Sequence, residues 1–170
     1  LFSWGMEYEY VKDNPVEHLS LAERPKSLGY ANRPWTDSER EAVLAALPAH
    51  MVLPISLMMF CGIDPQDALS LPKTAMTAEG LGTRRLKTGQ AVSQKLIAPL
   101  EVALANAPVH DAITLCANSR GEPWTYNGFS TNWDRLKKKL QAEGLIEPGL
   151  TLKGLRHTVG TILAEMGKSP

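Results

Sequence analysis

A polar, glycine-containing segment from Ala75 to Ile97 interrupts a chain whose other long segments have helical patterns. Within it, short runs with Thr, Val and Ile surround Gly80, Gly82 and Gly89, which is typical of two or three short antiparallel strands joined by tight turns. The chain is 170 residues long, enough for one ordinary domain. These features predict an α+β fold that is mostly α-helical, with a small antiparallel β-sheet inserted between helices.

Helix start and stop signals occur on both sides of this segment. Thr36 and Glu39 have the spacing of a capping box, and the apolar stripe that follows them ends at Pro48. An apolar run predicts a second, buried helix from His50 to Phe60. A later helix is marked by apolar residues at helical spacing, Phe129, Trp133, Leu136 and Leu140.

The first thirty residues differ in character from the rest. Apolar spacing over residues 1–10 predicts the end of a helix, which Asn14-Pro15 interrupts. The stretch from Val16 to Pro34 is polar and contains proline and glycine, as linkers do. We therefore expect residues 1–30 to be the end of one domain plus a linker, and residues 31–170 to be a second domain.

The charge balance limits the classes of function. Lys and Arg total 18 and Asp and Glu total 18, so the formal net charge is zero. A clearly basic domain is the usual sign of nucleic-acid binding, although a neutral total leaves room for a basic face. No apolar run approaches the ~20 residues that span a membrane. The two cysteines lie in apolar stretches and the four histidines are scattered, so we expect buried thiols and no metal site.

Three side chains that suit an anion stand close together near the end of the chain. Lys153, Arg156 and His157 lie at the start of an otherwise apolar helix, in the run Leu152-Lys153-Gly154-Leu155-Arg156-His157-Thr158. Lys153 and Arg156 are three residues apart, so one helical face can carry both. A guanidinium offers two donors to phosphate oxygens, and a helix N-terminus favours an anion. The pattern suits a phosphate; a solvated helix face and a buried histidine are the structural alternatives.

The same run resembles the (His/Lys)-x-x-Arg-His-Thr box of the tyrosine recombinases, the phage-integrase family. Other segments resemble parts of that family in the same order along the chain: Trp4 to Pro15, Arg33-Pro34-Trp35-Thr36, Asn118-Ser119-Arg120-Gly121 with Pro123-Trp124, and Ala164-Glu165-Met166-Gly167. The resemblance covers nearly the whole chain. It implies a tyrosine-recombinase catalytic domain, incomplete at its C-terminus, for residues 31–170. Residues 1–30 would be the C-terminal remnant of the core-binding domain, which clamps the DNA, plus the linker.

The resemblance also implies roles for individual residues. Arg156 and Lys153 would hold the phosphate at which DNA is cut, and His157 would brace the box. Lys87, in the run Arg85-Leu86-Lys87-Thr88-Gly89, would be the general acid that protonates the departing 5′ oxygen. A lysine beside a tight turn, with no catalytic role, is the structural alternative for Lys87.

A second basic cluster, Arg135, Lys137 and Lys138, lies on the predicted helix that contains Trp133. Contact with the DNA backbone is one interpretation of this cluster and a solvated helix face is the other. The resemblance implies duplex DNA with an attachment-like recombination site as the partner, no cofactor and no metal. It also implies a cytoplasmic protein of bacterial or phage origin, and leaves homo-oligomerisation on DNA open.

Asp64 departs from the family pattern. The stretch Gly62-Ile63-Asp64-Pro65-Gln66-Asp67-Ala68-Leu69 keeps the register of the family's Gly-x-Arg-x-x-(Asp/Glu)-Ala-Leu stretch, but puts Asp64 at the first catalytic arginine. At roughly 5 Å and an effective dielectric of about 20, each unit charge beside a phosphate is worth on the order of 3 kcal/mol. As a structural residue, Asp64 would instead cap a helix that Pro65 begins.

The nucleophile of the family is the other missing part. In the family a tyrosine follows the box, whereas the four tyrosines here all precede it, so none of them occupies the place of the nucleophile. The sequence leaves open whether a tyrosine follows Pro170. Two functions remain: a site-specific recombinase, seen as a fragment that Asp64 impairs, and a non-catalytic DNA-binding or assembly module that retains the recombinase fold. The sequence leaves open whether the chain is an enzyme.

Overall fold

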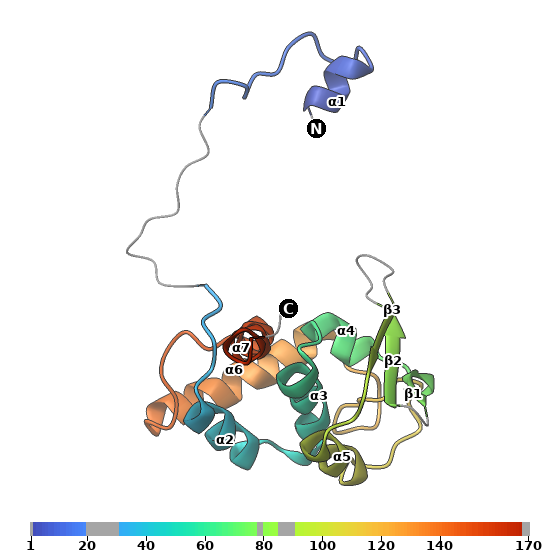
Figure 1. Ribbon diagram of the computed structural model, residues 1–170, viewed down its shortest axis with the longest axis vertical. Coiled ribbons are helices and arrows are strands. Elements are labelled where there is room, and N and C mark those ends of the chain that lie inside the picture. Colours follow the sequence, from blue (N-terminus) through green and yellow to red (C-terminus); the bar gives the residue numbers. More distant parts are fainter. Residues whose placement is uncertain (1, 20–30, 78–79, 85–90, 168–170) are drawn as a thin grey trace. The chain divides into compact units, whose positions relative to one another are not determined.

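The computed structural model describes residues 2–19, 31–77, 80–84 and 91–167 (Figure 1). The backbone divides into two compact units, Leu1–Tyr30 and Ala31–Pro170.

The first unit contains one helix, α1 (Phe2–Glu7), within its described residues. Its aromatic side chains cluster: the ring centroid of Trp4 lies 5.0 Å from that of Tyr8 and 5.4 Å from that of Tyr10. All three rings are largely exposed within this unit.

The second unit follows the predicted order of helices, a small sheet and further helices. Its elements are α2 (Asp37–Ala46), α3 (Ala49–Cys61), α4 (Pro65–Ser70), a 3₁₀ turn (Lys73–Ala75), β1 (Met76–Thr77), β2 (Gly80–Arg84), β3 (Ala91–Gln94), α5 (Ala98–Ala105), α6 (Tyr126–Ala142) and α7 (Leu152–Glu165).

The sheet has the order β1-β2-β3, and both pairs of strands are antiparallel. Met76 on β1 lies opposite Leu81 on β2, and Leu81 lies opposite Gln94 on β3. Leu81 is buried, so this register turns one apolar side chain of the middle strand into the core. The predicted mostly helical α+β fold with a small antiparallel sheet is confirmed.

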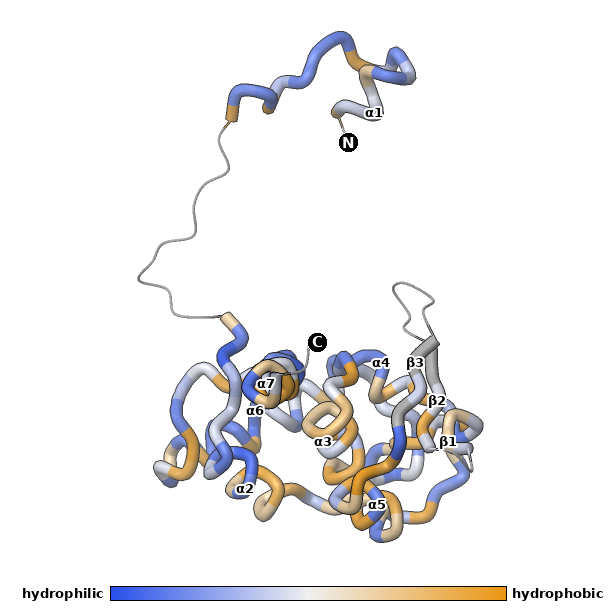
Figure 2. Tube along the Cα trace, in the orientation of Figure 1, coloured by the Kyte–Doolittle hydropathy of each residue, from blue (hydrophilic) through white to orange (hydrophobic). Residues whose placement is uncertain are grey.

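Helix α3 is the centre of the core. Met51, Ile55 and Met58 lie on one side of the helix and Leu53 and Leu57 lie on the opposite side, and all five are almost fully buried. A helix that is apolar all round must be covered on all sides. Figure 1 shows α3 between α2, α5 and α7, and in Figure 2 most of α3 has an apolar colour. Because α3 is enclosed, the neighbouring helices can present side chains to solvent only on their outer faces.

The described residues contain neither a candidate membrane-spanning helix nor a candidate metal site. Within the described ranges, none of the helices combines the length and apolarity that crossing a membrane requires. Among the same residues, no three His, Cys, Asp or Glu side chains gather in a way that could hold a metal ion.

Candidate functional site

Helix α7 has one buried face and one exposed face. Leu155 and Thr158 are buried, whereas Lys153, Arg156 and His157 are exposed. At about 100° per residue, the three exposed side chains fall within roughly 100° of one another around the helix. None of the three forms an ion pair with another described residue. The structure therefore brings these three predicted site residues together on one open, cationic face.

The first turn of α7 is built by local hydrogen bonds. Thr151 is the N-cap, and its Oγ1 accepts a hydrogen bond of 3.0 Å from the backbone N–H of Gly154. The box begins at Lys153, two residues after this cap, so Lys153 lies in the first turn. There the unpaired backbone N–H groups and the helix dipole both favour an anion.

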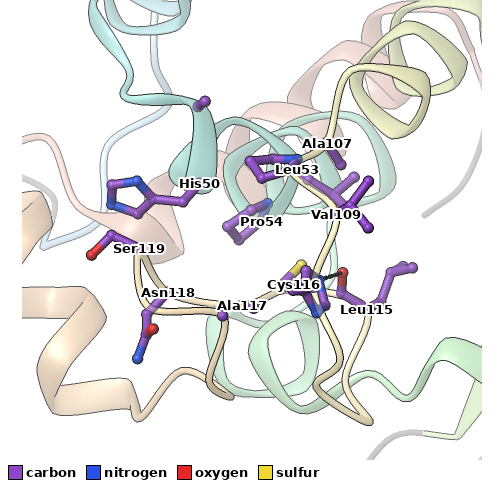
Figure 3. Close-up of a pocket in the computed structure, with 14 residues that line it drawn as sticks. His50, Leu53, Pro54, Ala107, Val109, Leu115, Cys116, Ala117, Asn118 and Ser119 are labelled. Carbon is purple, nitrogen blue, oxygen red and sulfur yellow. Dashed lines mark hydrogen bonds between the residues drawn. The ribbon is translucent and has the colours of Figure 1, made fainter.

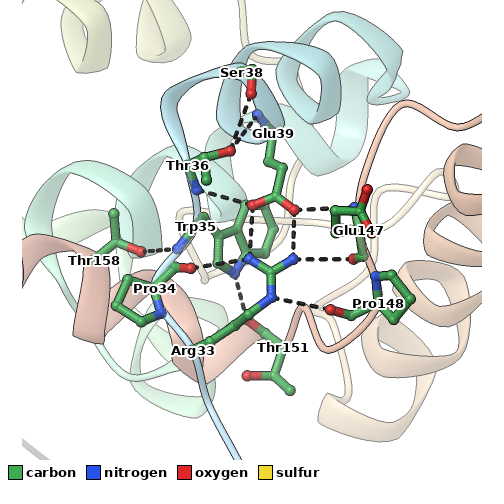
Figure 4. Close-up of polar contacts among 10 residues, drawn as sticks. All are labelled: Arg33, Pro34, Trp35, Thr36, Ser38, Glu39, Glu147, Pro148, Thr151 and Thr158. Carbon is green, nitrogen blue, oxygen red and sulfur yellow. Dashed lines mark hydrogen bonds and ion pairs between the residues drawn. The ribbon is translucent and has the colours of Figure 1, made fainter. Parts of the chain in front are cut away.

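A segment far away in the sequence holds the buried face of α7. We call residues 32–36 the strap. The backbone N–H of Trp35 donates to Thr158 Oγ1 at 2.8 Å, and Trp35 Nε1 donates to the carbonyl of Thr151 at 2.9 Å (Figure 4). Thr151 Oγ1 donates to Asn32 Oδ1 at 2.9 Å. The strap thus contacts α7 at two positions almost two helical turns apart.

Gly154 allows this close approach. A Cβ at Gly154 would lie 2.5 Å from the carbonyl oxygen of Arg33 and 3.0 Å from Trp35 Nε1. Glycine costs roughly 1 kcal/mol relative to alanine within a helix. The contact with the strap explains why glycine is needed at this position of the box.

An ion pair anchors the strap. Glu39 is 4% exposed and accepts hydrogen bonds from Arg33 at 2.9 and 2.5 Å. The same carboxylate accepts from the backbone N–H groups of Thr36 at 2.9 Å and Glu147 at 3.1 Å. The Arg33 hydrogen bond is the main cause that lowers the pKa of Glu39, to about 2. The predicted capping box of Thr36 and Glu39 is present, and Glu39 also ties α2 to the loop before α7.

Asp64 is the N-cap of α4. Its Oδ1 accepts a hydrogen bond of 3.1 Å from the backbone N–H of Gln66, and Pro65 occupies the first turn. The turn that leads to it passes beside α7, because a Cβ at Gly62 would lie 3.4 Å from Val159, one helical turn beyond Arg156. The hydrogen bond to Gln66 confirms the structural interpretation of Asp64 as a cap. The contact between Gly62 and Val159 shows that the turn before Asp64 lies next to α7.

The basic cluster of α6 is only partly available. Lys137 pairs with Asp134 at 2.9 Å, and Lys139 lies 3.9 Å from Glu143. Arg135 and Lys138 are exposed and form no ion pair with another described residue. At 100° per residue both point away from the buried side of α6, which carries Phe129, Trp133 and Leu140. Their position suits solvation as well as a contact with a polyanion.

One predicted site residue cannot be placed. Lys87 falls in residues 85–90, which lie outside the described residues. The strands β2 and β3 flank this range, so Lys87 belongs to the connection between two paired strands.

A pocket beside the start of α3 is separate from α7. A cavity of about 200 Å³ lies at the N-terminal end of α3 and is lined by His50, Leu53, Val109 and Cys116 among others (Figure 3). Burial lowers the pKa of His50 and raises the pKa of the Cys116 thiol to about 12. A thiol with this pKa is protonated at neutral pH, so Cys116 is no nucleophile. No α7 residue lines the cavity.

Sequence reasoning missed Thr158, Gly154 and Arg33 as contributors to the site. Thr158 and Gly154 are four apart on the buried side of α7, where a hydroxyl and a glycine interrupt otherwise apolar positions. That interruption is the signal that could have found them. Nothing local to Arg33 shows that its partners include the carbonyls of Glu147 and Pro148.

The overall geometry matches solved integrase structures. A dimer of lambda integrase residues 75–356 bound to a COC′ core site matches with a TM-score of 0.75, at 19% identity, over 98% of this chain and 61% of that chain. The Tn1549 transposon integrase (residues 82–397) in complex with circular intermediate DNA matches with a TM-score of 0.70, at 18% identity, over 99% of this chain and 64% of that chain.

These matches define the class of fold. The chain has the fold of tyrosine-recombinase catalytic domains, as the sequence predicted. It spans about three fifths of the length of these integrase structures. No protein-family model matches the sequence, and no curated protein matches it.

Proposed function

We propose that residues 31–170 are the catalytic-domain portion of a site-specific DNA recombinase of the phage-integrase type. Residues 1–30 would then be the end of the domain that clamps the DNA. The exposed face of α7 carries the proposal: Lys153, Arg156 and His157 lie together without ion-pair partners among the described residues, in a fold shared with integrases.

In the proposed reaction a tyrosine attacks a DNA phosphodiester, a 3′-phosphotyrosyl link forms, and a 5′ hydroxyl leaves. The guanidinium of Arg156 donates to two phosphate oxygens and the ammonium of Lys153 adds a mobile charge. Lys87 donates the proton that the departing 5′ oxygen needs. Because similar lambda integrase structures are dimers on a core site, the proposal extends to self-assembly on DNA.

Binding of a short, mixed-sequence duplex tests the phosphate site. We expect binding that weakens steeply between about 50 and 200 mM salt, because cations released from the DNA drive it. Replacing Arg156→Gln removes one phosphate contact, so the affinity should fall and the salt slope should decrease by about one unit. The measurement is fluorescence anisotropy at several salt concentrations.

A matched variant controls for the loss of one exposed positive charge. Arg120 is an exposed arginine that pairs with Glu122 at 3.0 Å, on a turn outside α7. Arg120→Gln should leave the salt slope unchanged. Equal slopes for the unchanged protein and Arg156→Gln would contradict the proposed phosphate site.

Asp64 favours a second candidate function, a non-catalytic DNA-binding or assembly module. Its carboxylate caps α4 and adds a negative charge where the family has an arginine. The two candidates differ in one product: only the recombinase forms a covalent link with a nicked suicide substrate. The protein encoded by the whole gene should be tested as it is and as Asp64→Arg. An adduct in the unchanged protein supports the recombinase, and an adduct only in the variant supports the module.

A further inference from the structure

Thr158 is a polar residue at the buried contact between α7 and the strap. It is 3% exposed, and both hydrogen-bonding roles of its hydroxyl are used. Oγ1 accepts from the backbone N–H of Trp35 at 2.8 Å and donates to the carbonyl of Gly154 at 2.8 Å. A single hydroxyl thus joins the strap to the backbone of the box itself.

The contacts of the strap all fall on one side of α7. Thr151, Gly154 and Thr158 are separated by three and four residues, so they form one row along the helix. Each of them touches the strap: Thr151 and Thr158 by hydrogen bonds and Gly154 by the close approach of its Cα. A row held at three points cannot turn about the helix axis unless these contacts break.

The cationic face is the other side of the same helix. Arg156 lies two residues, or about 200°, from Thr158 around the helix. At roughly 5–6 Å from the axis, a rotation of about 20° would move a charged group by about 2 Å. A bidentate contact between a guanidinium and a phosphate depends on geometry, so a shift of this size weakens it.

We infer that Thr158 is a positioning residue for the phosphate site. Its hydrogen bond to Trp35 sets the direction in which Arg156 projects, so the strap acts on phosphate binding without touching the phosphate. The inference rests on the proposed function of the α7 face. The strap lies at the start of the second compact unit and does not belong to the phosphate site. A displacement of the strap would therefore change the affinity for DNA indirectly, through the orientation of Arg156.

The test compares two threonines of the same helix. Thr158→Val keeps the shape of the side chain but removes both hydrogen bonds. Thr161 is the matched control, because its hydroxyl also donates to a carbonyl four residues earlier, at 3.0 Å, but it is exposed and has no hydrogen bond to the strap. Thr158→Ser keeps the hydroxyl and serves as the conservative variant. The whole chain is used, with a short mixed-sequence duplex as the probe.

We expect Thr158→Val to weaken duplex binding by at least about fivefold. Thr161→Val and Thr158→Ser should bind like the unchanged protein. Circular dichroism and thermal melting restrict the comparison to folded protein, since a purely structural role would lower the melting temperature and leave the affinity of folded molecules unchanged. An unchanged affinity in folded Thr158→Val would overturn the inference.

A double variant shows whether Thr158 acts through Arg156. In an Arg156→Gln background, Thr158→Val should weaken binding by less than about twofold, because the two residues serve one contact. Full additivity of the two losses would also overturn the inference, since Thr158 would then act elsewhere. If Arg156→Gln alone has no effect on affinity or salt slope, the proposed phosphate site fails first, and the inference fails with it.

A second strap variant keeps the inference testable if Thr158→Val does not fold. Trp35→Phe removes the Nε1–H that bonds Thr151 and part of the indole ring, but it leaves the backbone N–H of residue 35 and an aromatic ring facing Trp133, whose ring centroid lies 5.2 Å from that of Trp35. We expect a smaller loss of affinity in the same direction, again suppressed in the Arg156→Gln background. A loss that persists at full size in that background would count against the strap as a positioning element.

Discussion

At the scale of single residues, Asp64 combines two effects that can be separated. Its carboxylate oxygen caps α4 through Gln66, and its negative charge lies on the α3–α4 turn that passes beside α7. Asparagine caps helices about as well as aspartate does but carries no charge. The cap and the charge can therefore be removed independently.

We predict that Asp64→Asn changes the free energy of unfolding by less than about 0.5 kcal/mol, because the cap remains. The same variant should bind duplex DNA more tightly at low salt, because one negative charge near the phosphate is gone. Asp64→Ala should show the same gain in binding but lose about 1 kcal/mol of stability. Denaturant unfolding and anisotropy give the two quantities, and equal affinities for the unchanged protein and the Asp64→Asn variant would place the charge too far away to act.

Residue-level features of the sequence had unequal predictive value. The caps by Thr36 and Asp64 were predictable because a cap and its partner are only two or three residues apart. The contact between Trp35 and Thr158 spans 123 residues and leaves no local pattern. Helical spacing predicted that Lys153 and Arg156 share one face, whereas the exposure of His157 and the contact with the strap were not predictable from it.

At the scale of one element, α7 contains two glycines in opposite surroundings. A Cβ at Gly154 would meet the carbonyl oxygen of Arg33 at 2.5 Å, whereas a Cβ at Gly160 would meet nothing within 4 Å. Helix propensity favours alanine at both positions by roughly 1 kcal/mol. Only the contact with the strap distinguishes them.

We predict opposite signs for the two alanine variants. Gly160→Ala should stabilise the protein by about 0.5–1 kcal/mol, because the helix gains and nothing clashes. Gly154→Ala should destabilise it, because overpacking against backbone costs roughly 1–3 kcal/mol and exceeds the gain in propensity. Free energies of unfolding from denaturant titrations check both signs. A stabilising Gly154→Ala would mean that α7 does not pack against the strap as described.

At the scale of the whole molecule, Glu39 joins three parts of the chain. Its carboxylate bonds Arg33 in the strap, the backbone of Thr36 at the start of α2, and the backbone of Glu147 before α7. Glu147 and Glu39 are 108 residues apart. A buried carboxylate with these partners stays ionised in the folded state, which makes the stability of the domain depend on pH.

The sign of this dependence follows from the lowered pKa. Glu39 has a pKa of about 2 in the folded protein, whereas the ordinary pKa of this side chain is 4.5, so the unfolded chain binds more protons between these values. Its contribution, on the order of 3 kcal/mol, is complete above about pH 4.5 and is lost as the pH falls towards about 2. In Glu39→Gln, stability should be lower at neutral pH and should fall less steeply across this acidic range. Parallel pH profiles of the two proteins, from urea unfolding, would contradict this account.

The overall architecture was predictable for a different reason from the site. The order of helix signals, the polar segment with its glycines, and the (His/Lys)-x-x-Arg-His-Thr resemblance together predicted the fold that the integrase structures share. These signals are distributed over the whole chain, so single departures such as Asp64 do not remove them. The hydrogen bonds that close the domain have no such redundancy, because each depends on two residues that only the fold brings together.

The strap also determines where this domain can be divided from what precedes it. A polypeptide that began at Thr36 would still contain every helix of the second unit, and a boundary drawn from secondary structure alone would permit that cut. It would nevertheless leave the hydroxyl of Thr158 and the carboxylate of Glu39 buried without their partners in residues 33–35. We therefore expect the smallest independent version of this domain to start at or before Arg33, ahead of its first helix.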